Sequence, residues 1–191
     1  MPLPPNRILT VAFLKPGPGD PTFNHIVANM CKHKVCHTEI VFEDNMAFSI
    51  FAGMNIFFKP RTFSNPDYHL ISLSVSQSEY SNAYSFCQQA VEHNLCFTDI
   101  GMLSAYFQPQ TCPIINTSPS IDLGYTFCSK IVTEALQYAS IPEVEHLIPC
   151  TTTPSSLYDT LKDSPRKLLN SVPYKREQLR NSGIIIKYIS F

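Results

Sequence analysis

The most informative segment of the chain is Phe127-Cys128-Ser129-Lys130-Ile131-Val132-Thr133-Glu134-Ala135-Leu136. It lies within the clearest helical pattern of the sequence, residues 125–139. One apolar stripe recurs there at helical spacing: Phe127, Ile131, Val132, Ala135 and Leu136. A helix with such a stripe buries it against a core. Gly124 precedes this helix, so we expect the first turn, which carries Cys128, to open onto a groove.

Short strands and helices surround this segment. Apolar runs bounded by turn residues predict strands at residues 7–14, 35–42, 46–51, 55–58 and 69–75. Apolar spacing and capping residues predict helices at residues 23–32, 77–93 and 154–161. Residues 97–107 fit a helix or a strand equally well. This order predicts an α+β fold, in which one antiparallel sheet or small barrel packs against the cysteine-bearing helix.

Composition limits what the chain can do. With 191 residues, 44% of them hydrophobic and 15% charged, it has the size for one domain with a buried core. We assign residues 1–164 to that domain and residues 165–191 to a basic, solvated extension whose last strand, 184–191, docks on the sheet. The net charge of −1 gives no positive field to hold a polyanion, which argues against nucleic-acid binding.

No segment is typical of a membrane protein. The longest apolar run near the start, residues 8–14, is too short to cross a bilayer, and a proline-rich stretch precedes it in place of a basic leader. We therefore expect no export signal, no stable membrane insertion and a cytoplasmic location. The 7 cysteines include no C-x-x-C pair, so most are expected to be reduced, buried thiols.

Two side chains can carry nucleophilic chemistry. Cys128 falls in the first turn of its helix, where the macrodipole favours a thiolate and unpaired backbone N–H groups can bind an oxyanion. His37 lies near the start of its predicted strand, and Glu39 shares its face because strand side chains alternate. A helix N-terminus and a strand can thus supply nucleophile, base and oxyanion donors together.

Structural and metal-binding interpretations compete with this one. A single cysteine in a helix is usually a small buried hydrophobic residue, and a single histidine on a strand is usually a hydrogen-bonded structural residue. A zinc interpretation rests on four potential ligands within residues 31–37: Cys31, His33, Cys36 and His37. However, Cys36 and His37 point to opposite faces of their strand. We therefore expect neither a metal nor a cofactor.

The segment around Cys128 resembles that of a known family. Its order of cysteine, serine, a variable residue, a hydrophobic pair and an Ala-Leu end is similar to the nucleophile helix of the circularly permuted NlpC-like branch of the papain-like superfamily. That branch includes bacterial amidase-like proteins, the lecithin retinol acyltransferase group and related poxvirus proteins. The family's histidine opens a strand that ends in an acidic turn, as residues 37–44 do here. Residues 97–101 and 153–157 are weaker similarities, and the resemblance covers about residues 37–161.

The resemblance implies a permuted papain-like fold with Cys128 as nucleophile and His37 as its base. In this family a third polar residue, often an acid, comes from the strand after the histidine, and Ser49 stands in that place here. Glu39 is our substitute candidate for the third residue, and Asn55 is another.

The implied reaction is hydrolysis of a peptide, isopeptide or amide through a Cys-His acyl-enzyme mechanism. Two alternatives stay open: a lipid acyltransferase or thioesterase on the same scaffold, and a binding module that has lost efficient catalysis. The enzymatic interpretations require Cys128 and His37 to lie within proton-sharing reach in a solvent-open cleft.

Overall fold

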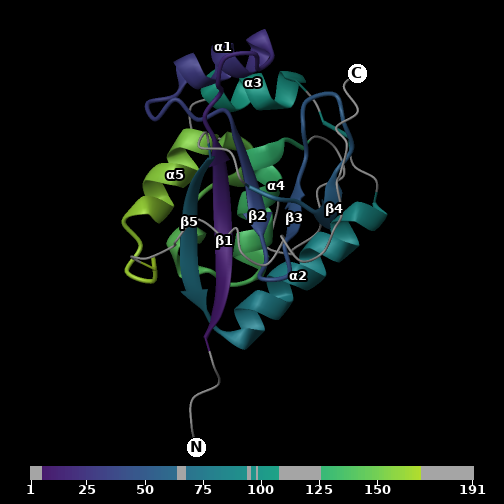
Figure 1. The fold of residues 1–191 in the computed structure, drawn as a ribbon, viewed down its shortest axis with the longest axis vertical. Coiled ribbons are helices and arrows are strands. Elements are labelled where there is room, and N and C mark those ends of the chain that lie inside the picture. The colour runs from purple at the N-terminus through teal and green to yellow at the C-terminus, as the bar shows by residue number, and fades with distance from the viewer. Residues whose placement is uncertain (1–5, 64–67, 94–95, 98, 108–125, 169–191) are drawn as a thin grey trace, which may run out of the picture.

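A five-stranded antiparallel sheet forms the centre of the protein. The computed structural model describes residues 6–63, 68–93, 96–97, 99–107 and 126–168. The strands are β1 Arg7–Leu14, β2 His37–Val41, β3 Met46–Ser49, β4 Phe57–Pro60 and β5 Tyr68–Val75. They are arranged in the order β4-β3-β2-β1-β5, and every pair is antiparallel (Figure 1). The predicted α+β class with an antiparallel sheet is therefore confirmed.

Helices pack on this sheet and at one of its ends. Their bounds are α1 Thr22–Met30, α2 Gln77–Glu92, α3 Asp99–Phe107, α4 Cys128–Tyr138 and α5 Pro154–Lys162, with 3-10 turns η1 Pro142–Val144 and η2 Pro149–Thr151. Helices α2 and α4 pack on the sheet, and α5 packs beside α4. Helices α1 and α3 lie together at the end of the sheet where β1 ends and β2 begins (Figure 1). Residues 97–107, for which the sequence fits a helix or a strand equally well, contain helix α3.

The helix starts follow their local sequence. At α2 the Ser76 hydroxyl accepts a hydrogen bond from the Glu79 backbone N–H (3.2 Å), and the Glu79 carboxylate accepts one from the Ser76 N–H (2.6 Å). This is the capping box that the S-x-x-E pattern predicts. At α5 Thr153 caps the helix in the same reciprocal way with Ser156, and Pro154 occupies the first helical position.

The apolar stripe of α4 lies at the centre of the core. All of its predicted members are buried: Phe127, Ile131, Val132, Ala135 and Leu136. Ile131 and Leu136 belong to one cluster with Ile40 of β2 and Phe48 of β3. Burying such a side chain stabilises a fold by about 1.5–3 kcal/mol. The stripe therefore fixes α4, and with it Cys128, against β2.

Two strands differ from the prediction near one turn. The strand expected at residues 46–51 ends at Ser49, and the strand expected at residues 55–58 becomes β4, shifted to Phe57–Pro60. The cause is a turn in which the Met54 N–H donates to the Phe51 carbonyl (3.0 Å). The shift affects the candidate site, because it makes Arg61 the residue after β4, and the Arg61 side chain contacts Glu39.

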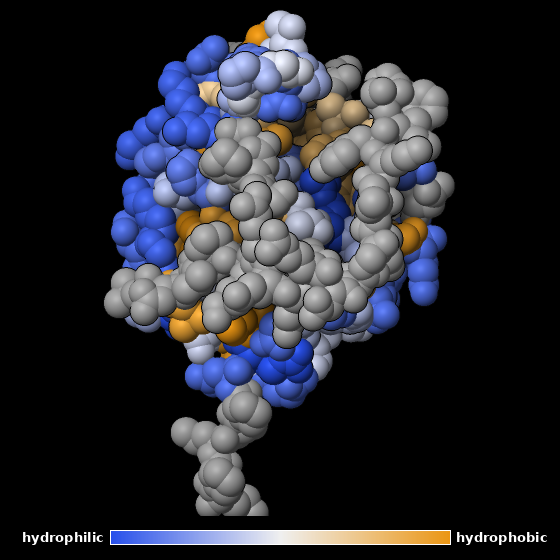
Figure 2. Space-filling view, in the orientation of Figure 1, coloured by the Kyte–Doolittle hydropathy of each residue, from blue (hydrophilic) through white to orange (hydrophobic). Residues whose placement is uncertain are grey.

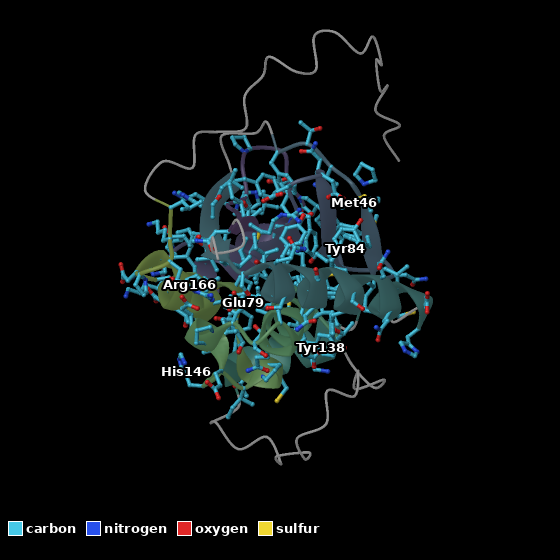
Figure 3. All side chains as sticks on the ribbon, turned by 90° about the horizontal axis from the view of Figure 1, so that it is seen from below. Met46, Glu79, Tyr84, Tyr138, His146 and Arg166 are labelled. Carbon is cyan, nitrogen blue, oxygen red and sulfur yellow. The ribbon has the colours of Figure 1, made fainter. Side chains whose placement is uncertain are left out.

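The start of the basic extension is part of the fold. Its backbone adds to the edge of the sheet, where the Ser74 N–H donates to the Arg166 carbonyl (2.9 Å) and the Leu168 N–H donates to the Ser72 carbonyl (2.8 Å). The Arg166 guanidinium pairs with Glu79 of α2 at 2.7 Å and with Glu143 of η1 at 2.8 Å (Figure 3). The expectation of a solvated arm is wrong at this residue, and the predicted strand at 184–191 lies outside the described residues.

The surface gives no sign of a membrane span. Within the described ranges, no helix is both long and apolar enough to cross a bilayer. On the face seen in Figure 2, hydrophilic side chains cover much of the described surface, and hydrophobic ones show between the grey atoms.

Candidate active site

Cys128 is the first residue of α4. The residue before it, Phe127, has extended backbone angles (φ −148°, ψ 167°) and makes no side-chain capping hydrogen bond. The first helical hydrogen bond runs from the Ile131 N–H to the Phe127 carbonyl (3.0 Å). The N–H groups of Cys128, Ser129 and Lys130 therefore precede the helical ladder and point out of the helix N-terminus. Backbone N–H groups in this position can bind an oxyanion, which is the role that the sequence predicts for them beside the thiol.

His37 is the first residue of β2 and lies between three partners. Its Nε2 atom is 3.4 Å from Oε1 of Glu39, and its ring stacks on Phe51 with 4.2 Å between centroids. It also lies against the Cys128 side chain, which raises its pKa. The fold thus brings together the nucleophile and base candidates, which the sequence could only pair by resemblance.

The pKa of His37 is shifted by its burial and by its neighbours Cys128 and Glu39. Burial lowers this pKa, but the charge and hydrogen bond of Cys128, followed by those of Glu39, raise it by more, to about 9. An imidazole with this pKa is protonated at neutral pH. The raised pKa of His37 therefore reflects how close Cys128 and Glu39 lie to the ring.

Glu39 is fully buried, at 0% exposure, and has charged and polar neighbours besides His37. The Tyr68 hydroxyl donates to Oε1 of Glu39 (3.3 Å), and Nε of Arg61 lies 3.4 Å from Oε2, which is close enough to pair the charges but is not aligned as a hydrogen bond. Sequence reasoning missed Arg61 and Tyr68, because neither belongs to a motif. Leu14 of β1 pairs with both His37 and Tyr68, so only the strand order shows that the two residues are near.

The structure disfavours the other two candidates for the third residue. The buried Ser49 hydroxyl donates to the Thr38 carbonyl (2.6 Å), so its proton is directed to the backbone and not to His37. Asn55 is exposed, and its side-chain oxygen accepts a hydrogen bond from the Cys96 thiol (3.2 Å). Of the three candidates, Glu39 is the one placed against the imidazole.

The expected solvent-open cleft is a wrong prediction. Cys128 is 2% exposed and His37 is 5% exposed. Phe127 belongs to an apolar cluster with Leu14 and with residues of α1 and α3, so side chains from several elements pack next to the thiol. Low exposure has an electrostatic consequence as well, because charges attract more strongly where water is excluded.

The four potential zinc ligands have separate partners. The Cys31 thiol meets the Tyr106 hydroxyl (3.4 Å), His33 Nε2 lies 2.7 Å from an Asp159 oxygen, and the Cys36 thiol donates to the Leu14 carbonyl (3.6 Å). Burial raises the pKa of Cys36 to about 12, so this neighbouring thiol stays protonated at neutral pH. In the part of the chain that the structure describes, no three His, Cys, Asp or Glu side chains converge as a metal site.

No family model, curated protein or solved structure matches the chain. The site is therefore interpreted from its own chemistry. A thiol at a helix N-terminus, an imidazole in contact with it and a buried carboxylate behind the imidazole can perform nucleophilic attack, proton transfer and oxyanion binding. This combination is the minimum that acyl transfer through a thioester requires.

Proposed function

We propose that this protein is a thiol hydrolase with a circularly permuted, NlpC-like papain fold. Cys128 is the nucleophile, His37 is the base and Glu39 orients His37. The observation that carries the proposal is that one imidazole contacts both the thiol at the start of α4 and the buried carboxylate of Glu39. The resemblance of residues 127–136 to the nucleophile helix of that family supports the same assignment.

In the first half of the reaction, His37 holds the proton of Cys128 and the thiolate attacks the carbonyl carbon of a peptide, isopeptide or other amide. A carbon–sulfur bond forms, and the carbonyl π electrons move to oxygen, which the N–H groups at the start of α4 stabilise. The tetrahedral intermediate then expels the amine, which takes the proton from His37. The product is a thioester on Cys128.

In the second half, water attacks the thioester while His37 removes its proton. The carbon–sulfur bond breaks, the carboxylic acid leaves, and the thiolate–imidazolium pair is restored. Glu39, whose Oε1 lies 3.4 Å from Nε2, holds the ring in place. The proposal also places the enzyme in the cytoplasm.

A binding module of the same fold is the second candidate. The burial of Cys128, at 2% exposure, favours the binding module, because a substrate carbonyl must reach the sulfur. The hydrolase proposal therefore requires that the packing around Cys128 open when substrate binds. The two candidates differ in whether the thiol can react in the folded protein.

Iodoacetamide alkylation at pH 7, mapped by mass spectrometry, separates the candidates. The protein contains two internal controls, since Cys96 is an exposed cysteine outside any disulfide and Cys87 is a cysteine at 0% exposure. If the protein is a hydrolase, iodoacetamide is expected to alkylate Cys128 about tenfold faster than Cys96. His37→Gln is expected to lower the alkylation rate of Cys128 to that of Cys96. If Cys128 reacts as slowly as Cys87, the hydrolase proposal is wrong and the binding module is favoured.

An acylating substrate tests the second step. With p-nitrophenyl acetate the hydrolase is expected to release a burst of nitrophenol and to carry one acetyl group on Cys128. Cys128→Ala is expected to abolish both signals and Cys96→Ser to leave both unchanged.

A further inference from the structure

Arg61 links the edge of the sheet to the candidate site. Its backbone N–H donates to the Asn45 carbonyl (2.9 Å), which fixes the residue after β4. Its side chain, 22% exposed, reaches back over the sheet, so that Nε is 3.4 Å from Oε2 of Glu39. Its Nη2 group donates to the Tyr68 hydroxyl (3.4 Å), which itself donates to Glu39 (3.3 Å). One guanidinium therefore contacts the carboxylate directly and also through a tyrosine.

The carboxylate depends on these contacts. A carboxyl group at 0% exposure favours its neutral form unless a cation and hydrogen-bond donors compensate for the lost water. The groups that face Glu39 are His37 on its own strand, Arg61 after β4 and Tyr68 on β5. Burial and the negative charge of Glu39 raise the pKa of Tyr68, so its hydroxyl keeps its proton and acts as a donor. Arg61 is therefore the permanent positive charge of this group.

Arg61 also belongs to the aromatic stack that holds the imidazole. The Phe51 ring lies on His37, and the Phe57 ring stacks on Phe51 at 5.3 Å. The guanidinium lies 5.0 Å from the centre of the Phe51 ring and 5.7 Å from that of Phe57. Arg61 thus contacts both supports of His37, the carboxylate at its Nε2 edge and the ring on its face.

We propose that Arg61 is a positioning residue of the site, which holds the Glu39 carboxylate and the Phe51 ring against His37. This inference rests on the proposed function. Without the guanidinium, Glu39 loses its cationic partner and is held less firmly against His37, whose pKa Glu39 helps to raise, so the imidazolium that faces the thiol is less stable.

The rate of Cys128 alkylation by iodoacetamide, measured from pH 4 to pH 9, tests this inference. In Arg61→Gln the rise of the rate with pH is expected to move up by about one pH unit, so that the rate on the rising part falls about tenfold. Arg61→Lys keeps the charge and is expected to restore most of the rate. The matched control is Lys59→Gln, which removes a cation that lies over the Phe57 ring at 5.1 Å, and it is expected to behave like the wild type.

A double-mutant comparison tests whether Arg61 acts through Glu39 and does not require Arg61→Gln to fold alone. In Glu39→Gln no buried charge is left to stabilise, so adding Arg61→Gln is expected to cause no further shift. A further shift in the double variant, or an unshifted profile in a folded Arg61→Gln, overturns the inference. Failure of the proposed function looks different, because wild-type Cys128 would then react as slowly as Cys87 over the whole pH range.

Discussion

Nε2 of His37 lies 3.4 Å from Oε1 of Glu39, two positions further along β2. The alternation of side chains along a strand places the two residues on the same face, and the full burial of Glu39 keeps water from competing for the contact. At this distance the two charges can interact, although Nε2 is not aligned to donate a hydrogen bond. The candidate orienting carboxylate therefore comes from the same strand as the candidate base.

Replacing Glu39 tests this orienting role. Glu39→Gln keeps the shape of the side chain but removes the charge that stabilises the imidazolium. We expect the rate of Cys128 alkylation at pH 6 to fall about ten- to hundredfold. A rate that stays within about twofold of the wild type, in a variant that unfolds at the wild-type temperature, contradicts the role assigned to Glu39.

Replacing Ser49 tests whether Ser49, and not Glu39, is the third residue. Its hydroxyl donates to the Thr38 carbonyl at 2.6 Å inside the sheet, so Ser49→Ala leaves a buried acceptor without that donor. We expect the free energy of unfolding to fall by about 1–3 kcal/mol, while the alkylation rate of Cys128 stays within about twofold. Urea unfolding and alkylation of the same sample measure both. A tenfold loss of rate with unchanged stability would return Ser49 to the site.

The parts of the site that sequence predicts are those within one element. The 3.6-residue period shows that α4 buries Ile131 and Leu136, and the two-residue period puts Glu39 beside His37. Both statements follow from local geometry alone. The capping box of Ser76 and Glu79 is local in the same sense.

The parts that sequence misses depend on which strands become neighbours. Tyr68 contacts Glu39 because β5 joins the sheet beside β1, and Arg61 contacts Glu39 because its side chain reaches across the sheet from the end of β4. The burial of Cys128 was missed for a similar reason, since packing around the first turn of α4 involves α1 and α3 as well as the sheet. No periodicity within one segment contains this information.

The raised pKa of His37 predicts a pH dependence of stability. Its ordinary value is 6.5 and its value in the folded protein is about 9, so the folded state holds this proton more tightly than the unfolded chain. The stabilisation is complete below pH 6.5 and is lost as the pH rises through 9. We expect the free energy of unfolding to fall by roughly 2–3 kcal/mol over that interval because of this group.

Urea unfolding at pH 6.5, 7.5 and 9 measures the effect, with the pH range set by the pKa of His37. His37→Gln is expected to flatten the dependence, whereas replacing the exposed His93 by Gln leaves the dependence as in the wild type. Equal slopes for the wild type and His37→Gln would show that His37 does not hold a proton in this way.

We expect the ion pairs of Arg166 to contribute strongly to holding the start of the extension against the domain. Its Nη1 pairs with Glu79 at 2.7 Å, while Nη2 and Nε contact the two oxygens of Glu143 at 2.8 and 3.0 Å. Charge-assisted hydrogen bonds of this geometry stabilise more than ordinary ones. Arg166→Met keeps the apolar stem and is expected to lower the free energy of unfolding by about 2 kcal/mol, and Lys167→Met is the matched control for loss of a neighbouring charge.

The ion pairs of Arg166 with Glu79 and Glu143 also predict how the free energy of unfolding changes at acid pH. Burial raises the pKa of Glu79, but hydrogen bonds from the Ser76 backbone and from Arg166 outweigh burial, so its pKa is below the ordinary 4.5. The pKa of Glu143 is lowered too, chiefly by its hydrogen bonds from Arg166 and Ser164 against the effect of burial. This stabilisation is present above pH 4.5 and is lost as the pH falls through the lower folded values. Arg166→Met should therefore be destabilised at pH 7 yet approach the wild type below pH 3, whereas a constant difference at every pH would mean that Arg166 stabilises the fold through packing and not through its charge.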